Sequence, residues 1–196
     1  MARGPDKQFD VEQALEAAMG LFWSRGYEGT SLAELTDAMG IGRKSLYDTF
    51  GNKRALFEQS LEHYGLGQYR EMVAALSSGA TPLDGIRALM ERWHGMSARK
   101  GSPGCLLGNN MAHFPVDDVD MAKRLRGYFD AVVQLVAGAL EEARAQGQLA
   151  SDVDVQDLAR LIVTTSQGTA LVSRVDDEGE VAGSVVRAVM GLLSAD

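Results

Sequence analysis

The sequence is short of the residues that build cross-linked or membrane-anchored proteins. Its 196 residues include one cysteine, Cys105, which excludes an internal disulfide framework and fits a reducing, cytoplasmic compartment. No apolar run approaches the roughly 18 residues needed to cross a bilayer, so we expect no membrane anchor. The opening residues, MARGPDKQFD, contain no apolar segment, and we therefore expect no signal peptide.

Patterns that carry catalysis are also missing. The sequence has no G-x-x-x-x-G-K-[ST], no H-E-x-x-H and no plausible nucleophile triad. The three histidines are scattered, without acidic or cysteine partners at ligand spacing, so we expect neither a metal site nor a cofactor. The chain is expected not to be an enzyme, and a small all-α enzyme is kept only as a remote alternative.

Strand patterns are scarce as well, and the four prolines all fall in loops or at helix starts. Apolar residues recur at helical spacing along most of the chain. This periodicity predicts an all-α fold of about nine helices, although several of the 22 glycines lie inside them at a cost of roughly 1 kcal/mol each. The expected helices cover about 10–25, 32–39, 43–50, 53–64, 82–99, 103–114, 118–145, 154–175 and 178–193.

Positive charge is scarce overall but is concentrated in one stretch. The net charge of -8 and the pI near 4.9 argue against binding of nucleic acid over the whole surface. Residues 41–54 nevertheless carry a net charge of +3, whereas residues 57–196 carry -7. Contact with phosphates requires such a local excess of positive charge. Arg3 and Lys7 form a short basic tail, which is either a frayed terminus or an arm that touches DNA.

The basic stretch belongs to a predicted helix-turn-helix. Ser31 and Glu34 have the spacing of a capping box, and Gly40 suits the left-handed residue that ends the first of these helices. In the short helix that follows, Leu46 and Phe50 face inward at i, i+4. A helix-turn-helix needs a second helix that buries one side and offers donors, acceptors and cations on the other. The opposite face carries Arg43, Lys44, Tyr47 and Asp48.

The segment from Gly26 to Phe57 resembles the DNA-binding segment of TetR-family transcriptional regulators. The resemblance is carried by the G-Y-x-x-T-S entry, the S-L-Y-x-x-F helix and the G-x-K-x-x-L-F opening of the next helix. It implies a helix-turn-helix domain at 1–56 and a helical effector-binding and dimerisation domain at 57–196. It further implies a homodimeric repressor, released from palindromic double-stranded operator DNA by a small-molecule effector. Gly42 departs from the Ser or Thr frequent in the family, which removes a possible cap and phosphate contact.

The expected DNA contacts divide into base reading and phosphate binding. Arg43 and Lys44 stand at the start of the recognition helix, where side chains reach base edges. Tyr47 and Lys53 match the positions that hold phosphate in the family, and Lys53 also lies at a helix N-terminus. Asp48 either accepts a hydrogen bond from cytosine N4 or pairs with Lys44 at i, i+4. The remaining candidates are Thr30, Ser31, Ser45 and Thr49.

The last two expected helices are apolar on more than one face, as in helices that pack against a partner as well as their own core. The resemblance implies that this partner is the same pair of helices from a second subunit. The alternative is a monomer in which both helices are fully buried. The expected interface residues are Leu158, Ile162, Thr165, Val172, Val185, Val189 and Leu193.

Methionine and aromatic residues cluster in the middle helices, where such residues at helical spacing usually form core. By resemblance, the effector pocket lies among these helices, with His94 and His113 as possible polar contacts. The expected pocket residues are Met90, Trp93, Met96, Leu107, Asn110, Met111, Phe114 and Tyr128.

Cys105 has two interpretations. With Ser102 as cap and Pro103 as first residue, Cys105 is expected in the first turn of a helix, where the N-terminus stabilises a thiolate. It is then either a sensor of oxidants or electrophiles, or a small core residue. Regulation by Cys105 chemistry or by a protein partner is therefore the alternative to a small-molecule effector.

Overall fold

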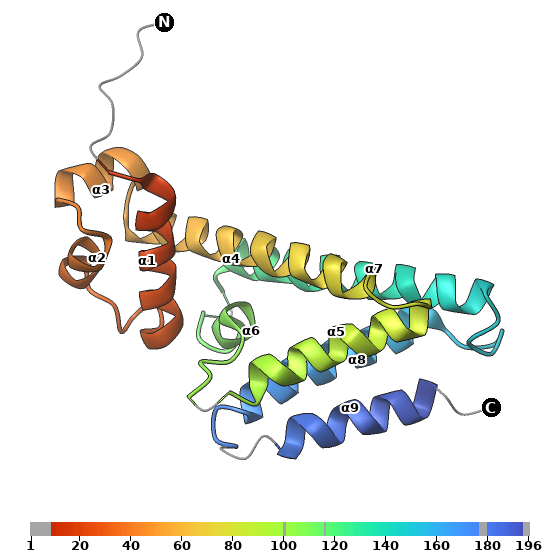
Figure 1. The fold of residues 1–196 in the computed structure, drawn as a ribbon. Coiled ribbons are helices and arrows are strands. Elements are labelled where there is room, and N and C mark those ends of the chain that lie inside the picture. Colours follow the sequence, from red (N-terminus) through yellow and green to blue (C-terminus); the bar gives the residue numbers. More distant parts are fainter. Residues whose placement is uncertain (1–8, 100, 116, 177–179, 194–196) are drawn as a thin grey trace, which may run out of the picture. The chain divides into compact units, whose positions relative to one another are not determined.

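The computed structural model describes residues 9–99, 101–115, 117–176 and 180–193, and in this part of the chain all regular structure is helical (Figure 1). The all-α prediction of about nine helices is confirmed. None of the described helices combines the length and apolar character needed to span a bilayer. The helices are α1 (Val11–Arg25), α2 (Leu32–Met39), α3 (Arg43–Phe50), α4 (Lys53–Leu76), α5 (Pro82–Ser97), α6 (Leu106–Met111), α7 (Val119–Ala145), α8 (Val155–Val172) and α9 (Glu180–Leu193).

The first compact unit ends at Leu66 and holds α1, α2, α3 and the start of α4. Its core is built from side chains at helical spacing, and Phe22, Leu35, Leu46 and Phe57 are fully buried in it. The rings of Phe22 and Phe57 meet edge to face with centroids 5.0 Å apart, a favoured aromatic geometry. These contacts fix α1 against α4 and leave α2 and α3 as the helices with exposed polar faces.

The helix caps of the first unit are those predicted from the sequence. Asp10 accepts hydrogen bonds from the amides of Glu12 and Gln13 at the start of α1. Ser31 and Glu34 form the predicted capping box of α2. Gly40 ends α2 with φ of 64°, a left-handed conformation that glycine adopts without a steric penalty.

The second compact unit begins at Gly67 and contains the end of α4 together with α5 to α9. α7 packs against α5 and α8, and α9 packs against the same two helices. The shared core is apolar and includes the fully buried Ile86, Leu89, Val136 and Leu140, together with Ile162, which is 1% exposed. This unit is therefore a helical bundle around one core.

The α4 helix is longer than predicted. It was expected to end near Tyr64 because Gly65 and Gly67 weaken a helix, but it continues to Leu76. Met72 and Leu76 in its last turns pack against the core of the second unit, and this burial offsets the propensity of the glycines. The division between the units consequently falls inside α4, between residues 66 and 67, rather than at 56/57.

Other helix bounds also differ from prediction. α6 begins at Leu106 rather than Pro103, because Gly104 adopts φ of 77° and Cys105 takes the N-cap position. α8 ends at Val172, and a turn follows it. The expected start of the last helix at 178 lies outside the described residues, as do Arg3 and Lys7 of the basic tail.

Candidate nucleic-acid interface

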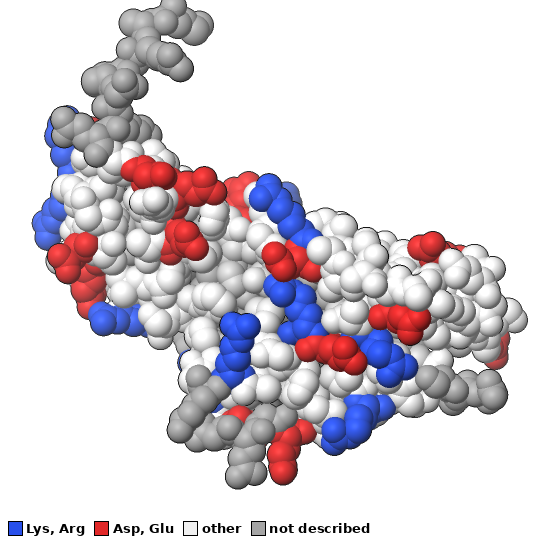
Figure 2. Space-filling view, viewed as in Figure 1, with Lys and Arg blue, Asp and Glu red and all other residues white. Residues whose placement is uncertain are grey.

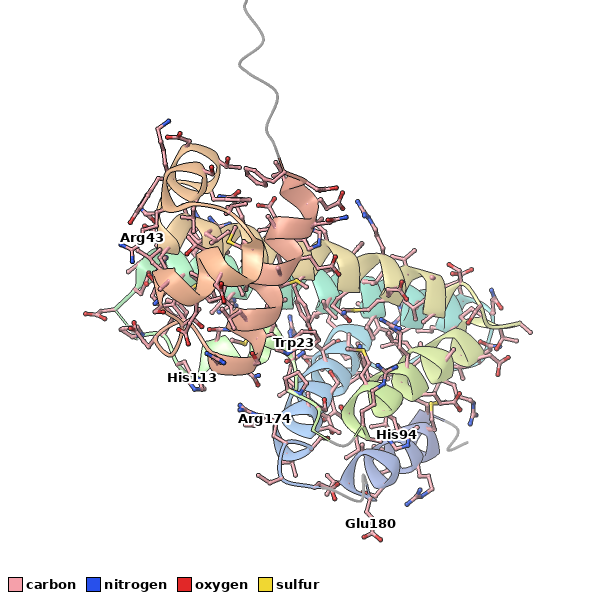
Figure 3. All side chains as sticks on the ribbon, turned by 60° about the vertical axis from the view of Figure 1, so that its left-hand side comes forward. Trp23, Arg43, His94, His113, Arg174 and Glu180 are labelled. Carbon is pink, nitrogen blue, oxygen red and sulfur yellow. The ribbon has the colours of Figure 1, made fainter. Side chains whose placement is uncertain are left out.

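The α3 helix separates its buried face from its exposed face, as the sequence predicted. Leu46 is 0% exposed and Phe50 3%, so the two pack into the first unit. Arg43, Lys44 and Tyr47 lie on the other side and are exposed to solvent. Figure 3 shows Arg43 projecting away from the helices of the first unit. The exposed face offers two cations and a phenol from one short helix.

The start of α3 has little local support. Gly42 is its N-cap and offers no side-chain hydrogen bond to the helix amides. Arg43 follows as the first residue, so its guanidinium and the free amides lie at the positive end of the helix dipole. This end of α3 is suited to an anion or to the acceptor edge of a guanine.

Lys53, the first residue of α4, is held by an aromatic ring. Its Nζ lies 4.3 Å from the centroid of Tyr27, within cation–π range. Tyr27 is held in turn between Phe22 and Phe57, with ring centroids 6.2 Å and 5.0 Å away. Burial raises the pKa of the Tyr27 phenol above its ordinary value. Tyr27 is the Y of the G-Y-x-x-T-S motif, but its contact with Lys53 was not predicted from the sequence.

The N-terminus of α2 is closed by a network around Glu34. The Glu34 carboxylate accepts hydrogen bonds from the Ser31 amide at 2.8 Å and from the Ser31 hydroxyl at 2.7 Å. The same carboxylate pairs with Arg25 from α1. The hydrogen bonds from Ser31, followed by the charge of Arg25, lower the pKa of Glu34. The carboxylate therefore fixes the end of α1 to the start of α2.

The predicted DNA contact of Thr30 is wrong. Thr30 is 1% exposed, and its hydroxyl donates to the Gly26 carbonyl at 2.8 Å, so it closes the α1–α2 turn instead of facing solvent. Ser31 is exposed, but its hydroxyl already serves the cap of α2. Ser45 and Thr49 are half-buried on α3. These hydroxyls are less available than the charged groups of the same motif.

Asp48 pairs with Lys44 in this structure. The carboxylate and the ammonium are 3.3 Å apart at i, i+4 on α3, and both side chains are largely exposed. Exposed pairs of this kind contribute at most about 1 kcal/mol, so either group can leave the pair to contact a base. Both predicted roles of Asp48 remain compatible with the geometry.

The charged surface is mixed rather than uniformly basic. On the face shown in Figure 2, Lys and Arg side chains are interspersed with Asp and Glu. This distribution matches the net charge of -8 and leaves the exposed face of α3 as a small local basic site.

The predicted dimer residues divide between core and surface. Ile162, Val189 and Leu193 are buried in the core of this chain, so these three assignments are wrong: they already pack against its own helices. Leu158, Thr165 and Val185 are half-buried, and Val172 is exposed. The exposed apolar residues mostly lie one position before the predicted ones along the chain. A seven-residue spacing fits two neighbouring faces of one helix, so the sequence does not show which of them is exposed. The exposed stripes consist of Leu161, Thr164, Gly168 and Leu171 on α8, with Val181, Ala188 and Leu192 on α9.

Two of the predicted effector residues line a cavity that the structure describes. Met90 and Trp93 line a small cavity between α5, α8 and α9, and none of the other six lines it. Met111 is 43% exposed, and the buried Asn110 amide donates to the Leu106 carbonyl at 2.7 Å. The half-buried members are Met96, Leu107, Phe114 and Tyr128. His113 is exposed, and its Nδ1 lies 2.7 Å from the Asn109 carbonyl oxygen.

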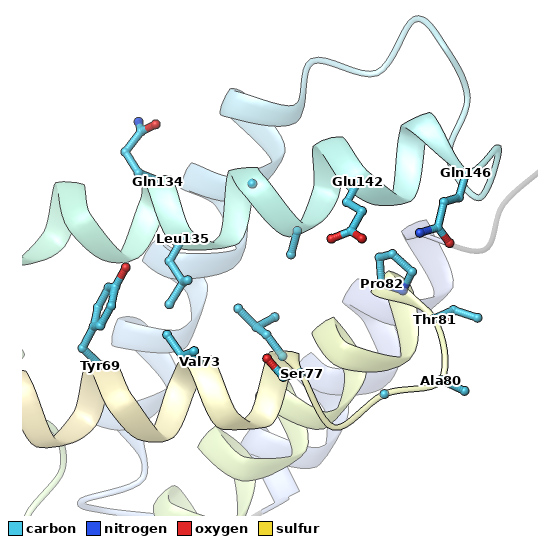
Figure 4. A pocket seen from close by; sticks show the side chains of 14 residues that line it. Tyr69, Val73, Ser77, Ala80, Thr81, Pro82, Gln134, Leu135, Glu142 and Gln146 are labelled. Atoms are coloured by element: carbon cyan, nitrogen blue, oxygen red, sulfur yellow. The ribbon is translucent and has the colours of Figure 1, made fainter.

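A larger open groove of about 710 Å³ lies between the end of α4 and α7 (Figure 4). Tyr69 and Val73 face it from α4, and Leu135 and Glu142 face it from α7. None of the eight predicted effector residues lines this groove. No sequence pattern predicted this groove, because it depends on the unexpected last turns of α4.

Cys105 is the N-cap of α6 rather than a residue of its first turn. Its Sγ accepts a hydrogen bond from the Gly108 amide at 3.4 Å, and the residue is half-buried. It is thus neither a core residue nor freely exposed. Among the described residues, no group of three or more His, Cys, Asp or Glu is placed to hold a metal ion.

Two family descriptions match the chain and together cover most of it. Residues 14–59 match "Bacterial regulatory proteins, tetR family". Residues 82–189 match "Tetracyclin repressor-like, C-terminal domain". The first match contains α2, α3 and the start of α4, and the second contains most of the helices of the second unit.

Relatives and solved structures agree with this assignment. The transcriptional repressor ComR of Escherichia coli is 30% identical over 177 residues, covering 88% of this chain and 83% of the relative. The uncharacterized regulator YezE of Bacillus subtilis is 29% identical over 176 residues, covering 88% and 90%. A cysteine mutant of the TetR-family regulator CifR, solved with a 26-base-pair operator duplex, has a TM-score of 0.85 at 29% identity and covers 95% of this chain and 98% of that one.

These relatives are transcriptional regulators rather than enzymes, and the exposed cationic face of α3 lies within the matched DNA-binding segment. The chain belongs to the TetR family and is a DNA-binding transcriptional regulator.

Proposed function

We propose that the chain is a homodimeric repressor that binds a two-fold symmetric operator through α3 of each subunit and releases it when a small molecule binds the second unit. The observation that carries the DNA-binding part is the division of α3 into a buried face, Leu46 and Phe50, and an exposed face. The exposed face begins with Arg43 and Lys44 at the end of the helix that enters a major groove in this motif.

Within this interface, Arg43 and Lys44 read bases and Tyr47 and Lys53 bind phosphate. The guanidinium of Arg43 can donate two hydrogen bonds to O6 and N7 of one guanine. Lys53 brings its ammonium to the N-terminal end of α4, where the helix amides also attract a phosphate. The operator complex of CifR and the repressor names of ComR and DhaR support this proposal.

Dimerisation is proposed to use the exposed stripes of α8 and α9. Leu161 and Leu171 are 48% and 54% exposed, and Leu192 is 65% exposed, so apolar surface remains uncovered on both helices. A self-complementary patch of this kind suits a two-fold dimer. A dimer in turn places two α3 helices on one duplex, about 34–36 Å or a multiple of it apart.

Release is proposed to act through α4. This helix begins at Lys53 beside the DNA-binding segment and ends at Leu76 in the second unit, so a shift of its last turns is carried along one rigid element. A small change in each subunit would alter the separation of the two recognition helices. Coupling of about 1–3 kcal/mol, typical of allostery, would lower operator affinity roughly 5- to 150-fold.

The DNA-binding proposal is tested with three variants and one selected duplex. Lys53→Gln should weaken binding to selected and scrambled duplexes alike and lower the salt slope by about one unit. Arg43→Ala should cost about 1–3 kcal/mol on the selected duplex and little on the scrambled one. Lys123→Ala, which removes an exposed cation of α7, is the control and should change neither the affinity for the two duplexes nor the salt slope. Equal losses on both duplexes for Arg43→Ala would remove its base-reading role.

The release proposal is tested by reciprocity. A ligand found by thermal-shift screening is titrated into the protein with and without operator. Operator DNA must weaken ligand binding by the same factor by which the ligand weakens operator binding. Equal ligand affinity in the two titrations would rule out release by that ligand.

Regulation through Cys105 is the second candidate, and one contact favours it. The Sγ of Cys105 accepts the Gly108 amide at the start of α6, so oxidation or alkylation of the sulfur would remove the cap of that helix. Cys105→Ser retains a capping oxygen but not the thiol chemistry. An unchanged response of operator binding to peroxide in Cys105→Ser would dismiss this mechanism.

A further inference from the structure

A small, partly open cavity in the second unit lies between α5, α8 and α9. Its volume is about 20 Å³, room for little more than one water molecule. Apolar side chains and hydroxyls share its wall, and the only lining residue that can carry a charge is His94. The lining residues are Met90, Trp93, His94, Ser97, Ser166, Thr169, Ala182, Val185 and Val186.

The polar groups of this cavity have unused hydrogen-bonding capacity. The Nδ1 atom of His94 is buried and has no hydrogen-bond partner among the described residues. The hydroxyls of Ser166 and Thr169 each donate to a carbonyl of their own helix at 2.8 Å, which leaves their oxygen lone pairs free to accept. Buried polar groups are normally satisfied, so a partner in the cavity is expected.

His94 also forms part of the wall of an open groove on the outside of the bundle. This groove has a volume of about 640 Å³ and is shared between the end of α5 and the start of α9. A Cβ atom on Gly183 would lie 3.6 Å from Cε1 and 4.0 Å from Nε2 of His94, so one edge of the ring lies against α9. Figure 3 shows His94 between these two helices. One imidazole therefore stands between the groove and the cavity.

We propose that this cavity is the effector site, that rotation of His94 joins it to the groove, and that the effector is a small uncharged alcohol or phenol. The proposal rests on the release mechanism proposed above and names its ligand class. A charged ligand is disfavoured inside the cavity because its wall carries no fixed charge, Glu180 and Arg187 line only the outer groove, and burial of an unpaired ion is costly. A hydroxyl fits because its O–H can donate to the unpartnered Nδ1 of His94.

The position of the site connects it to the proposed dimer surface. α8 and α9 each carry cavity residues on one side and an exposed apolar stripe on another. A ring larger than the present cavity must move His94 and separate α5 from α9. Binding then changes the relative position of the two stripes that the proposed partner subunit contacts.

Four probes test the ligand class in the full chain. The sequence has two tryptophans, so Trp23→Phe leaves Trp93, on the cavity wall, as the sole fluorescent reporter. Phenol and cyclohexanol should shift its emission saturably, with dissociation constants in the millimolar range or tighter. Anisole, which lacks the hydroxyl donor, should bind about two- to tenfold more weakly. Benzoate, of similar size but charged, should not bind.

Three variants test the position of the site. His94→Phe keeps a ring of similar shape but removes Nδ1, and it should weaken phenol binding about two- to tenfold while leaving anisole unchanged. Ala182→Leu should fill the cavity and abolish binding of both. If circular dichroism shows that Ala182→Leu is unfolded, Val186→Leu adds one methylene to the same wall and should weaken both probes. Val73→Leu, in the groove of Figure 4, is the matched control and should bind phenol as the parent does.

The proposal is overturned if phenol and cyclohexanol leave Trp93 emission unchanged, if benzoate binds as well as phenol, or if the folded cavity-filling variant binds normally. Operator binding is then measured with saturating phenol. Phenol that binds at Trp93 but leaves operator affinity unchanged would support the site and contradict its role as the effector site. If phenol still lowers operator affinity in the folded cavity-filling variant, release acts elsewhere in the chain and the site is overturned.

Discussion

An ammonium group above an aromatic ring is restricted to few positions, and Tyr27 holds Lys53 in this way. The ring is itself fixed by Phe22 and Phe57, so the position of the ammonium depends on the core of the first unit. In DNA binding, such pre-organisation lowers the entropy lost when the lysine contacts a phosphate.

The role of Tyr27 is testable with a matched pair of substitutions. Tyr27→Phe keeps the ring and should retain the salt slope and affinity for DNA. Tyr27→Leu removes the ring, which contributes about 0.5–1 kcal/mol to holding an exposed cation, and should weaken all duplexes about two- to fivefold. Fluorescence anisotropy at several salt concentrations measures both quantities. The same affinity for Leu and Phe variants would show that the ring does not position Lys53.

Glu34 should make stability depend on pH at the acid end. Its pKa is lowered in the folded chain by Ser31 and then by Arg25, so its stabilising effect is fully present above the unfolded pKa near 4.3. The effect is lost as pH falls through the lower, folded pKa. Glu34→Gln should therefore differ most from the parent above the unfolded pKa and converge with it as the pH falls through the lower, folded pKa, as measured by urea unfolding. A constant difference between the two proteins across this range would contradict the shift.

Single residues also mark what the sequence could and could not predict. The roles of Ser31 and Gly40 in capping depend on neighbours within four residues, and both were predicted. Thr30 was misassigned because its burial depends on the packing of the α1–α2 turn. The ring of Tyr27 comes within reach of Lys53 only through the tertiary fold.

At the scale of elements, the apolar stripes of α8 and α9 determine the proposed assembly. Leu171 is 54% exposed, so a carboxylate there leaves the core intact. Leu171→Glu should yield folded monomers that bind the operator at least tenfold more weakly, since two half-sites are no longer held together. Sedimentation velocity and anisotropy measure the two effects. Val119→Glu on α7, where the parent valine is 72% exposed, is the control and should change neither.

A stable wild-type monomer at micromolar concentration would contradict the assembly, as would a dimer that survives Leu171→Glu. Ile162→Glu is not an equivalent test. Ile162 is 1% exposed within the core of the second unit, so a charge there would unfold that unit before it reported on dimerisation.

Helices with strong local signals were predicted well, and those set by distant contacts were not. α7 ends at Ala145 as expected, because Gly147 and the turn that follows are local signals. α4 passes two glycines because Met72 and Leu76 are buried by residues far away in sequence. The two stripes of α8 could not be ranked from the sequence, since both are apolar and only packing shows which is covered.

At the scale of the whole molecule, an acidic chain carries a local excess of positive charge at the DNA-binding segment. The net charge is -8, yet residues 41–54 carry +3 and include the exposed face of α3. A molecule of this kind repels DNA except where the basic site is aligned with phosphates, which favours a specific complex over nonspecific coating. Two such sites in a dimer require a target with two half-sites in a fixed spacing.

Selection of duplexes from a random library by the wild-type chain tests most directly whether a dimer reads DNA through α3. We expect one enriched two-fold symmetric sequence, with half-sites about 10–10.5 base pairs apart or a multiple of that spacing. We also expect Arg43→Ala to select a sequence with relaxed preference at matching positions of both half-sites. Recovery of no enriched sequence, or of an asymmetric one that Arg43→Ala selects unchanged, would contradict a dimeric regulator that reads DNA through α3.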